Sequence, residues 1–197
     1  MSSAPNMRRG DLEMTNEQAR KMLELGYAGR LATYGMDGYP YCVPLLYVWA
    51  EHQVFVHGTN AASHFQANIR HEPRVCFELD EPGEVFDYGR FECDSGLSFR
   101  SLILFGTMRL TEDRAAKQLF CERLMEKYGK ANSIRPKNFF PRLDIINVYA
   151  MTISRMTGKE KALPGLCEQW PNKDRTRTPD ARPEAFHRDV TRSETGQ

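Results

Sequence analysis

Apolar and polar positions along this chain follow two different periods. Between residues 28 and 110, short runs of β-branched and aromatic side chains are separated by Gly, Pro and Asp, which is typical of strands joined by turns. Residues 15–25 and 111–128 instead place apolar side chains three or four positions apart, and this spacing predicts helices. The pattern therefore predicts a mainly β protein with few helices.

Six strands are predicted, and the first two flank a strong hairpin signal, Met36-Asp37-Gly38. Strong hairpin signals combined with few helices favour a small antiparallel barrel, closed or partly closed, with helices at its rim. The predicted strands are residues 28–34, a second around 43–49, 54–56, 74–79, 98–110 and 145–155.

The second strand is apolar on both faces, from Val43 to Trp49. A half-exposed strand of a monomer would not need this, so a ligand, a helix or another subunit is expected to cover its second face. Pro44 removes a backbone donor, which predicts an edge or a bulge at that point.

Helix boundaries are also marked. Thr15 and Gln18 fit a capping box, and that helix is expected to end at Gly26. Residues 111–113 are expected to cap a second helix that ends at Gly129. Between them, residues 61–70 should form a short helix capped by Thr59 or Asn60.

The segment HGTNAASHFQANIRH (57–71) connects the third strand to this short helix, and it has two interpretations. It can be an ordinary corner with a cap, or free N–H groups and hydroxyls at the helix start can form a seat for phosphate. His57, His64 and His71 cannot share one helical face, so no metal site is predicted from them.

Length, charge and cysteine content limit the domain number, the partners and the location that can be expected. The 197 residues suit one domain, expected over residues 14–160, with an N-terminal arm (1–13) and an extended C-terminal tail (161–197). A net charge of +1 argues against a nucleic-acid partner. Five scattered cysteines predict reduced, mostly buried thiols, and no run suits a signal peptide or a membrane span. We therefore expect a cytoplasmic location without membrane or nucleic-acid partners.

The sequence lacks the signatures of Rossmann, P-loop, zincin and serine-hydrolase proteins. Arg30 lies in an otherwise apolar strand, where its head can reach water or face an anionic ligand. Ser101, on a predicted core strand, can equally bond its own backbone or a ligand.

Together, an ordered set of motifs resembles the pyridoxamine 5'-phosphate oxidase-like flavoproteins, and within them the branch related to 5-nitroimidazole-resistance proteins. The resemblance covers roughly residues 8–160. Its motifs are Arg30-Leu31-Ala32-Thr33, Val43-Pro44-Leu45, His57-Gly58-Thr59 with Ser63-His64, residues 68–77, Phe99-Arg100-Ser101-Leu102 with Gly106, and Val148-Tyr149 through Lys159.

The resemblance implies a six-stranded split β-barrel that forms a homodimer and binds FMN in clefts between the subunits. It also implies the cofactor-binding residues. These are Arg30, Leu31, Ala32 and Thr33 on the ribityl and phosphate side, Val43, Pro44 and Leu45 beside the ring, His57, Gly58, Thr59, Ser63 and His64 at the phosphate end, and Ser101, with Lys159 as an additional basic side chain.

Two positions depart from the family pattern. Phe65 follows His64 where many relatives carry a lysine that meets the phosphate, and Phe99 stands where tyrosine is common. The implied activity is FMN-dependent reduction of small planar acceptors such as nitroaromatics, with His64 as the candidate proton donor or a mere phosphate-side cap. A flavin-binding or sensing module without turnover, or an interaction protein with an empty cleft, are the alternatives.

Overall fold

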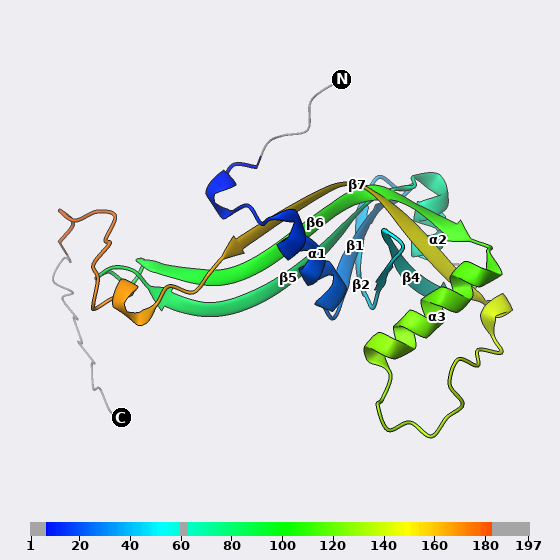
Figure 1. Cartoon of the computed structure of the whole chain (residues 1–197). Helices are drawn as coiled ribbons and strands as arrows, with labels where there is room; N and C mark the ends of the chain where they lie inside the picture. The colour runs from blue at the N-terminus through cyan, green and yellow to red at the C-terminus, as the bar shows by residue number, and fades with distance from the viewer. Residues whose placement is uncertain (1–6, 60–62, 183–197) are drawn as a thin grey trace, which may run out of the picture. The chain divides into compact units, whose positions relative to one another are not determined.

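The computed structural model describes residues 7–59 and 63–182. Seven strands form one sheet in the order β2-β1-β5-β6-β7-β4-β3 (Figure 1). The strands are β1 (Gly29–Tyr34), β2 (Pro40–Leu45), β3 (Val48–Ala50), β4 (Gln53–Thr59), β5 (Arg74–Asp87), β6 (Ser95–Thr111) and β7 (Ile146–Lys161). The prediction of a mainly β, antiparallel fold is confirmed, whereas the barrel and the homodimer stay predictions.

The prediction of six strands is wrong, because the second predicted strand is divided. β2 ends at Leu45 and pairs with β1, whereas β3 begins at Val48 and pairs with β4. The cause lies at Tyr47, whose side chain is fully buried and whose hydroxyl donates to the Leu23 carbonyl at 2.5 Å. Its backbone also lies against the Tyr128 hydroxyl, so it is held away from a ladder partner.

Three α-helices accompany the sheet: α1 (Asn16–Leu25), α2 (His64–His71) and α3 (Arg114–Tyr128). The capping box at Thr15 and Gln18 and the end of α1 at Gly26 are confirmed. The cap of α3 at Asp113 and its end at Gly129 are confirmed as well.

The predicted cap of the short helix α2 is wrong for Thr59. Ser63 caps this helix, and its hydroxyl accepts from the Gln66 N–H at 3.3 Å. Thr59 is instead the last residue of β4, while Asn60 lies outside the described residues.

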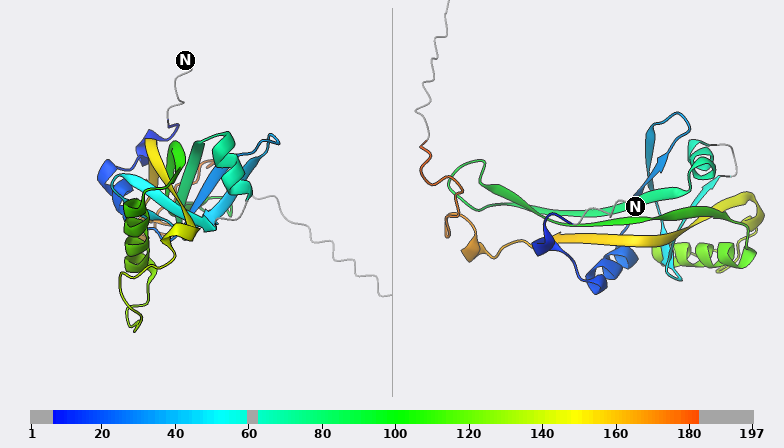
Figure 2. Two further views of the ribbon diagram at one scale, coloured as in Figure 1. Left: turned by 90° about the vertical axis from the view of Figure 1, so that its right-hand side faces the viewer. Right: turned by 90° about the horizontal axis from the view of Figure 1, so that it is seen from above.

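The main core collects side chains from α1, α2 and five strands, including Leu23, Leu31, Val56, Phe77 and Leu104. A second cluster joins α3 to β3, β4 and β7 through Val48, Phe55, Phe120, Leu143 and Val148. Figure 2 shows α2 beside the β1–β2 hairpin, whose turn contains Gly38 with a φ of 82°. A positive φ of this kind favours glycine.

The chain divides into two compact units, residues 1–84 with 97–163 and residues 85–96 with 164–197. Within the described part of the second unit, the tail is bonded to the tip of the β5–β6 hairpin. Trp170 N–H donates to the Asp87 carbonyl at 3.0 Å, and Arg175 N–H donates to the Tyr88 carbonyl at 2.7 Å. The described part of the tail is therefore tied to its own chain at Trp170 and Arg175.

The five cysteines are free thiols, but only Cys121 is buried. Cys42, Cys93 and Cys167 are exposed and Cys76 is intermediate, so the prediction of mostly buried thiols is wrong. Cys42 on β2 and Cys76 on β5 lie on the two strands that flank β1, each opposite Ala32.

Candidate functional site

The alternation of β1 divides its four predicted site residues between two faces. Leu31 is fully buried and Thr33 is 4% exposed, whereas Arg30 and Ala32 are only partly covered. Successive side chains on a strand point to opposite faces. Only Arg30 and Ala32 therefore lie on the face that a ligand can reach.

Carboxylates already surround Arg30. The register of β1 and β5 sets Arg30 opposite Glu78, and Arg30 Nε donates to Glu78 Oε2 at 2.5 Å. The same guanidinium pairs with Asp80. A phosphate at this position would meet two negative side chains beside the one positive group.

Thr33 has a structural role in this chain. Its hydroxyl accepts from Asn68 Nδ2 at 3.0 Å and donates to the Tyr41 carbonyl at 3.3 Å. Asn68 belongs to α2, so the Thr33 hydroxyl links the helix to the β1–β2 hairpin. Both hydrogen-bonding directions of this hydroxyl are used within the fold.

β2 is the edge strand beside β1, and its predicted residues again alternate. Val43 and Leu45 are half-buried against the main core, whereas Pro44 is exposed. Pro44 lies opposite Arg30 in the register, which agrees with its predicted edge position. β2 thus offers Pro44 to the open face and uses Val43 and Leu45 for packing.

His57, Gly58 and Thr59 form the last part of β4, opposite the first residues of β7. The His57 ring lies 5.5 Å from the Phe120 ring between centroids, and partial burial lowers the pKa of His57 below its ordinary value. A Cβ placed on Gly58 would meet no atom within 4 Å, so the space beside Gly58 is open. This end of β4 carries hydroxyl and amide donors and no carboxylate.

His64 is the first residue of α2, and its ring lies 5.9 Å from the Tyr41 ring in an edge-on arrangement. Both rings line an open cavity of about 300 Å³ between α2 and the β1–β2 hairpin. The lining residues are Gly35, Met36, Asp37, Tyr39, Pro40, Tyr41, His64, Ala67 and Asn68. His64 therefore meets an aromatic and apolar cavity through its exposed ring.

Phe65 occupies the position where the resemblance expects a lysine. Its ring packs edge-on against Tyr149 at 4.6 Å between centroids and adds to the main core. Because the side chain faces the protein interior at this point, an apolar residue is favoured there.

Ser101 and Lys159 are cross-strand partners on β6 and β7, so they share one face of the sheet. β1 is three strands from β7 in the sheet order, which corresponds to about 14 Å at the usual strand spacing. The structure therefore brings Ser101 and Lys159 to each other, but it does not bring Lys159 beside Arg30.

Three side chains near the predicted site residues were not predicted: Glu78, Asp80 and Tyr39. Glu78 and Asp80 alternate with Phe77 and Leu79, so the sequence does signal two carboxylates on one face of β5. Their approach to Arg30 depends on the pairing of β1 with β5, which residue types do not specify. Tyr39, in the cavity beside His64, was assigned only to the hairpin.

The chain matches a known protein family. A family model described as pyridoxamine 5'-phosphate oxidase matches residues 15–160. The chain belongs to this family of flavin-binding oxidoreductases, as its motifs predicted.

Solved structures share the fold at low sequence identity. A protein described as a candidate for 5-nitroimidazole antibiotic resistance, from Bacteroides thetaiotaomicron, is 16% identical with a TM-score of 0.62, covering 75% of this chain and 86% of its own. The flavocytochrome Anf3 of Azotobacter vinelandii is 20% identical with a TM-score of 0.67, covering 81% and 73%. An FAD and heme binding protein of Mycobacterium smegmatis is 18% identical with a TM-score of 0.64, covering 77% and 74%.

No curated protein gives a significant match to this sequence. Within residues 7–59 and 63–182, no group of three or more His, Cys, Asp and Glu side chains is arranged to hold a metal ion. In the same part of the chain, no helix is both long and apolar enough to cross a membrane.

The donor set of this chain fits a flavin phosphate at one place and not at another. The end of β4 and the start of α2 supply hydroxyls, first-turn N–H groups and two imidazoles, which suit an anion. Arg30 does not fit as the anchor, because its guanidinium is bound to Glu78 and Asp80. Residues 57–59 and Ser63 are therefore better candidates for the phosphate end than Arg30, while the ring of His64 faces the aromatic cavity.

Proposed function

We propose that this protein is an FMN-dependent oxidoreductase that reduces small planar acceptors such as nitroaromatics. We also propose that it acts as a homodimer with the cofactor cleft between subunits. Family membership supports a flavin as the cofactor, and the fold shared with a flavocytochrome and with a candidate 5-nitroimidazole-resistance protein is consistent with it.

One observation carries the proposal for the site. Ser63 caps α2 with a hydroxyl suited to a phosphate, and the ring of the next residue, His64, lines an aromatic cavity of about 300 Å³. Thr59, four residues before Ser63 in the sequence, adds a second hydroxyl at the end of β4. Ligand cavities typically combine an apolar lining with a few convergent polar groups. His64 and Asn68 supply polar groups in this cavity, and Tyr39 and Tyr41 supply its aromatic lining. The hydroxyls of Thr59 and Ser63 would serve the phosphate end.

Each residue would have a separate task. Ser63, Thr59 and the first N–H groups of α2 would donate to the phosphate. Pro44 would exclude water beside the ring, while Val43 and Leu45 support β2 from the core side. When bound, FMN supplies hydride transfer at its N5 atom. An imidazole nitrogen of His64 would deliver a proton to the acceptor, because an imidazole can both accept and release a proton.

The absorbance spectrum of the purified protein tests the cofactor directly. We expect a flavin spectrum, or saturable binding of added FMN, and identification of the released chromophore as FMN. Protein that shows no flavin absorbance and binds no added FMN would refute the proposal. Light scattering should give the mass of two chains.

Turnover is tested separately by reducing the FMN-loaded protein and adding a 5-nitroimidazole. We expect reoxidation faster than that of free FMN, slowed about a hundredfold by His64→Asn if this imidazole transfers the proton. His71→Asn, at the other end of α2, is the matched control and should keep the rate. Binding without faster reoxidation would identify a flavin-binding module without turnover.

A further inference from the structure

A second candidate binding region lies in the basic loop, which we define as residues 129–142. It connects α3 to the short 3-10 helix Leu143–Ile145 and contains no helix or strand of its own. Figure 1 shows it projecting from the end of α3. Long connections of this kind inside a compact domain are commonly functional.

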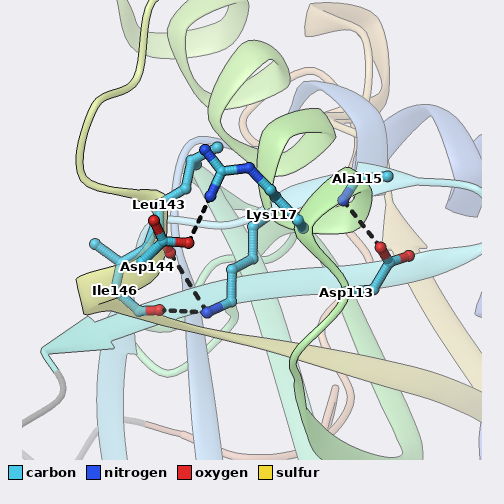
Figure 3. A network of polar contacts seen from close by, with 7 residues as sticks. Asp113, Ala115, Lys117, Leu143, Asp144 and Ile146 are labelled. Carbon is cyan, nitrogen blue, oxygen red and sulfur yellow. Dashed lines mark hydrogen bonds and ion pairs between the residues drawn. The ribbon is translucent and has the colours of Figure 1, made fainter.

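Both ends of the basic loop are fixed to the fold. Lys117 Nζ donates to the Ile146 carbonyl at 3.0 Å and to the Leu143 carbonyl at 3.4 Å (Figure 3). Arg114 pairs with Asp144 at 2.5 Å, and Leu143 is buried in the second core cluster. At the other end, the Gly129 N–H donates to the Met125 carbonyl at 2.9 Å. The loop therefore begins and ends at defined places.

The basic loop has only one sign of charge. It contains Lys130, Arg135, Lys137 and Arg142 and no acidic residue, although the whole chain has a net charge of only +1. The acids on either side are engaged elsewhere, since Glu126 pairs with Arg123 at 2.8 Å and Asp144 pairs with Arg114. In the part of the chain that the structure describes, no ion pair within 4.0 Å joins these four cations to a carboxylate.

Three of these cations face a common cavity. Lys130, Arg135 and Lys137 line a cavity of about 330 Å³ together with Phe139 and Phe140. Phe140 packs against the second core cluster, whereas Phe139 is 67% exposed. Arg135 Nε donates to Ser133 Oγ at 3.1 Å, so this guanidinium is oriented by a side chain that also lines the cavity.

We propose that this cavity binds a small anionic ligand that carries a planar ring, of the class of a mononucleotide. Unpaired cations attract a phosphate, and an exposed aromatic ring offers a stacking surface for a planar group. The cavity volume lies within the range of small-ligand sites. The inference goes beyond the proposed function, because it shares no residue with the candidate flavin site.

The test is a calorimetric titration of the full-length protein with AMP, with FMN present at no more than one equivalent per chain so that no free FMN competes. We expect saturable binding that weakens as salt rises, with adenosine and inorganic phosphate each binding more weakly than AMP. The double variant Lys130→Glu with Lys137→Glu should lose about tenfold or more in affinity. Phe139→Ala should lose about fivefold, by removing the stacking surface.

The matched control is Arg20→Glu with Lys21→Glu, which makes the same change in net charge on the exposed face of α1. It should leave AMP binding unchanged. Absence of saturable AMP binding, or equal binding by both double variants, would overturn the proposal.

A further arm of the experiment uses anionic vesicles, because the fully exposed Ile134 side chain could contact a membrane surface. Binding to vesicles without AMP binding would also overturn it. Repeating the titration without FMN separates this result from any failure of flavin binding.

Discussion

Arg30 and the cations of the basic loop have opposite surroundings. Arg30 sits on a regular strand and faces Glu78 and Asp80, which neutralise it within the sheet. Lys130 and Lys137 lie on an irregular connection that carries no carboxylate. Arg30, which the sequence suggested as a phosphate anchor, is thus already paired with carboxylates of its own chain.

The contrast teaches that the identity of a cation does not decide what it binds. Strand pairing brings distant segments together and can supply carboxylates that local sequence does not reveal, whereas a loop retains the charge pattern of its own residues. Lys127, two residues before the basic loop, is a third case. Its Nζ is buried without a hydrogen-bond partner in the described chain and lies 3.8 Å from the centre of the Tyr47 ring.

The largest expected effect comes from Gly29→Ala, which disturbs the pairing that sets Arg30 opposite Glu78. A Cβ at Gly29 would overlap the fully buried Phe77 ring. We expect a loss of about 3 kcal/mol in the free energy of unfolding, because overpacking forces strand and ring apart. Denaturant titration measures this. Gly10→Ala, where a Cβ meets nothing within 4 Å, is the control, and equal stability of the two variants would contradict the prediction.

Lys127 should make stability depend on pH. Burial lowers the pKa of Lys127 from 10.5 to about 8 in the folded protein. Between these values the unfolded chain binds more protons, so stability increases as pH rises from 8 towards 10.5. We expect the free energy of unfolding of the native protein, relative to Lys127→Met, to rise by about 2 kcal/mol over this range.

Chemical denaturation at pH 7.5 and 10.5 measures that change. Lys130→Met, which makes the same substitution at an exposed lysine, serves as the comparison. A constant difference between the native protein and Lys127→Met across the two pH values would show that Lys127 is not desolvated.

Phe65→Lys introduces the lysine that many relatives carry at this position. To meet the phosphate, the new side chain has to turn out of the interior, where Phe65 packs against Tyr149. We expect about tenfold tighter FMN binding from a charge-assisted contact. The loss of the Tyr149 contact should cost about 1.5 kcal/mol of stability. Fluorescence titration with FMN and thermal unfolding measure both. Phe65→Met keeps an apolar side chain without charge, and tighter binding by it as well would argue against the role of charge.

The smallest effect is expected from freeing Arg30. Glu78→Gln with Asp80→Asn keeps the side-chain shapes but removes both negative charges. We expect FMN affinity to rise about threefold at low salt, an effect that salt should reduce because these groups are partly exposed. Glu81→Gln, whose partner is Arg100, is the control. No gain in affinity would indicate that Arg30 lies too far from the phosphate to matter.

Local patterns predicted the elements well where a few residues decide the backbone. The turn at Met36-Asp37-Gly38, the capping box at Thr15 and the end of α3 at Gly129 all depend on nearby residues, and all occur as predicted. The division of the second strand at Tyr47 depends on α1 and α3, which contact it from far along the sequence. The extensions of β5 to Asp87 and β6 from Ser95 were also missed, because their Gly, Asp and Glu residues suggested a loop.

For the candidate site, the sequence indicated individual residues but not the side chains that contact them. It grouped Arg30, Leu31, Ala32 and Thr33, yet strand alternation buries two of them. It placed His64 at a helix start, which is correct, but the aromatic cavity beside that ring forms only when the hairpin meets α2. Contacts between separate segments set these features, and periodicity cannot supply them.

Tyr47 has a mechanical consequence. Its hydroxyl holds α1 through Leu23, and its backbone holds α3 through Tyr128, whose hydroxyl also lies 2.7 Å from the Tyr27 carbonyl. A single residue between the two edge strands β2 and β3 is thus a common anchor for two outer helices. Any displacement of that edge, by a docked subunit or an inserted ring, must be transmitted through this anchor to the helices behind it.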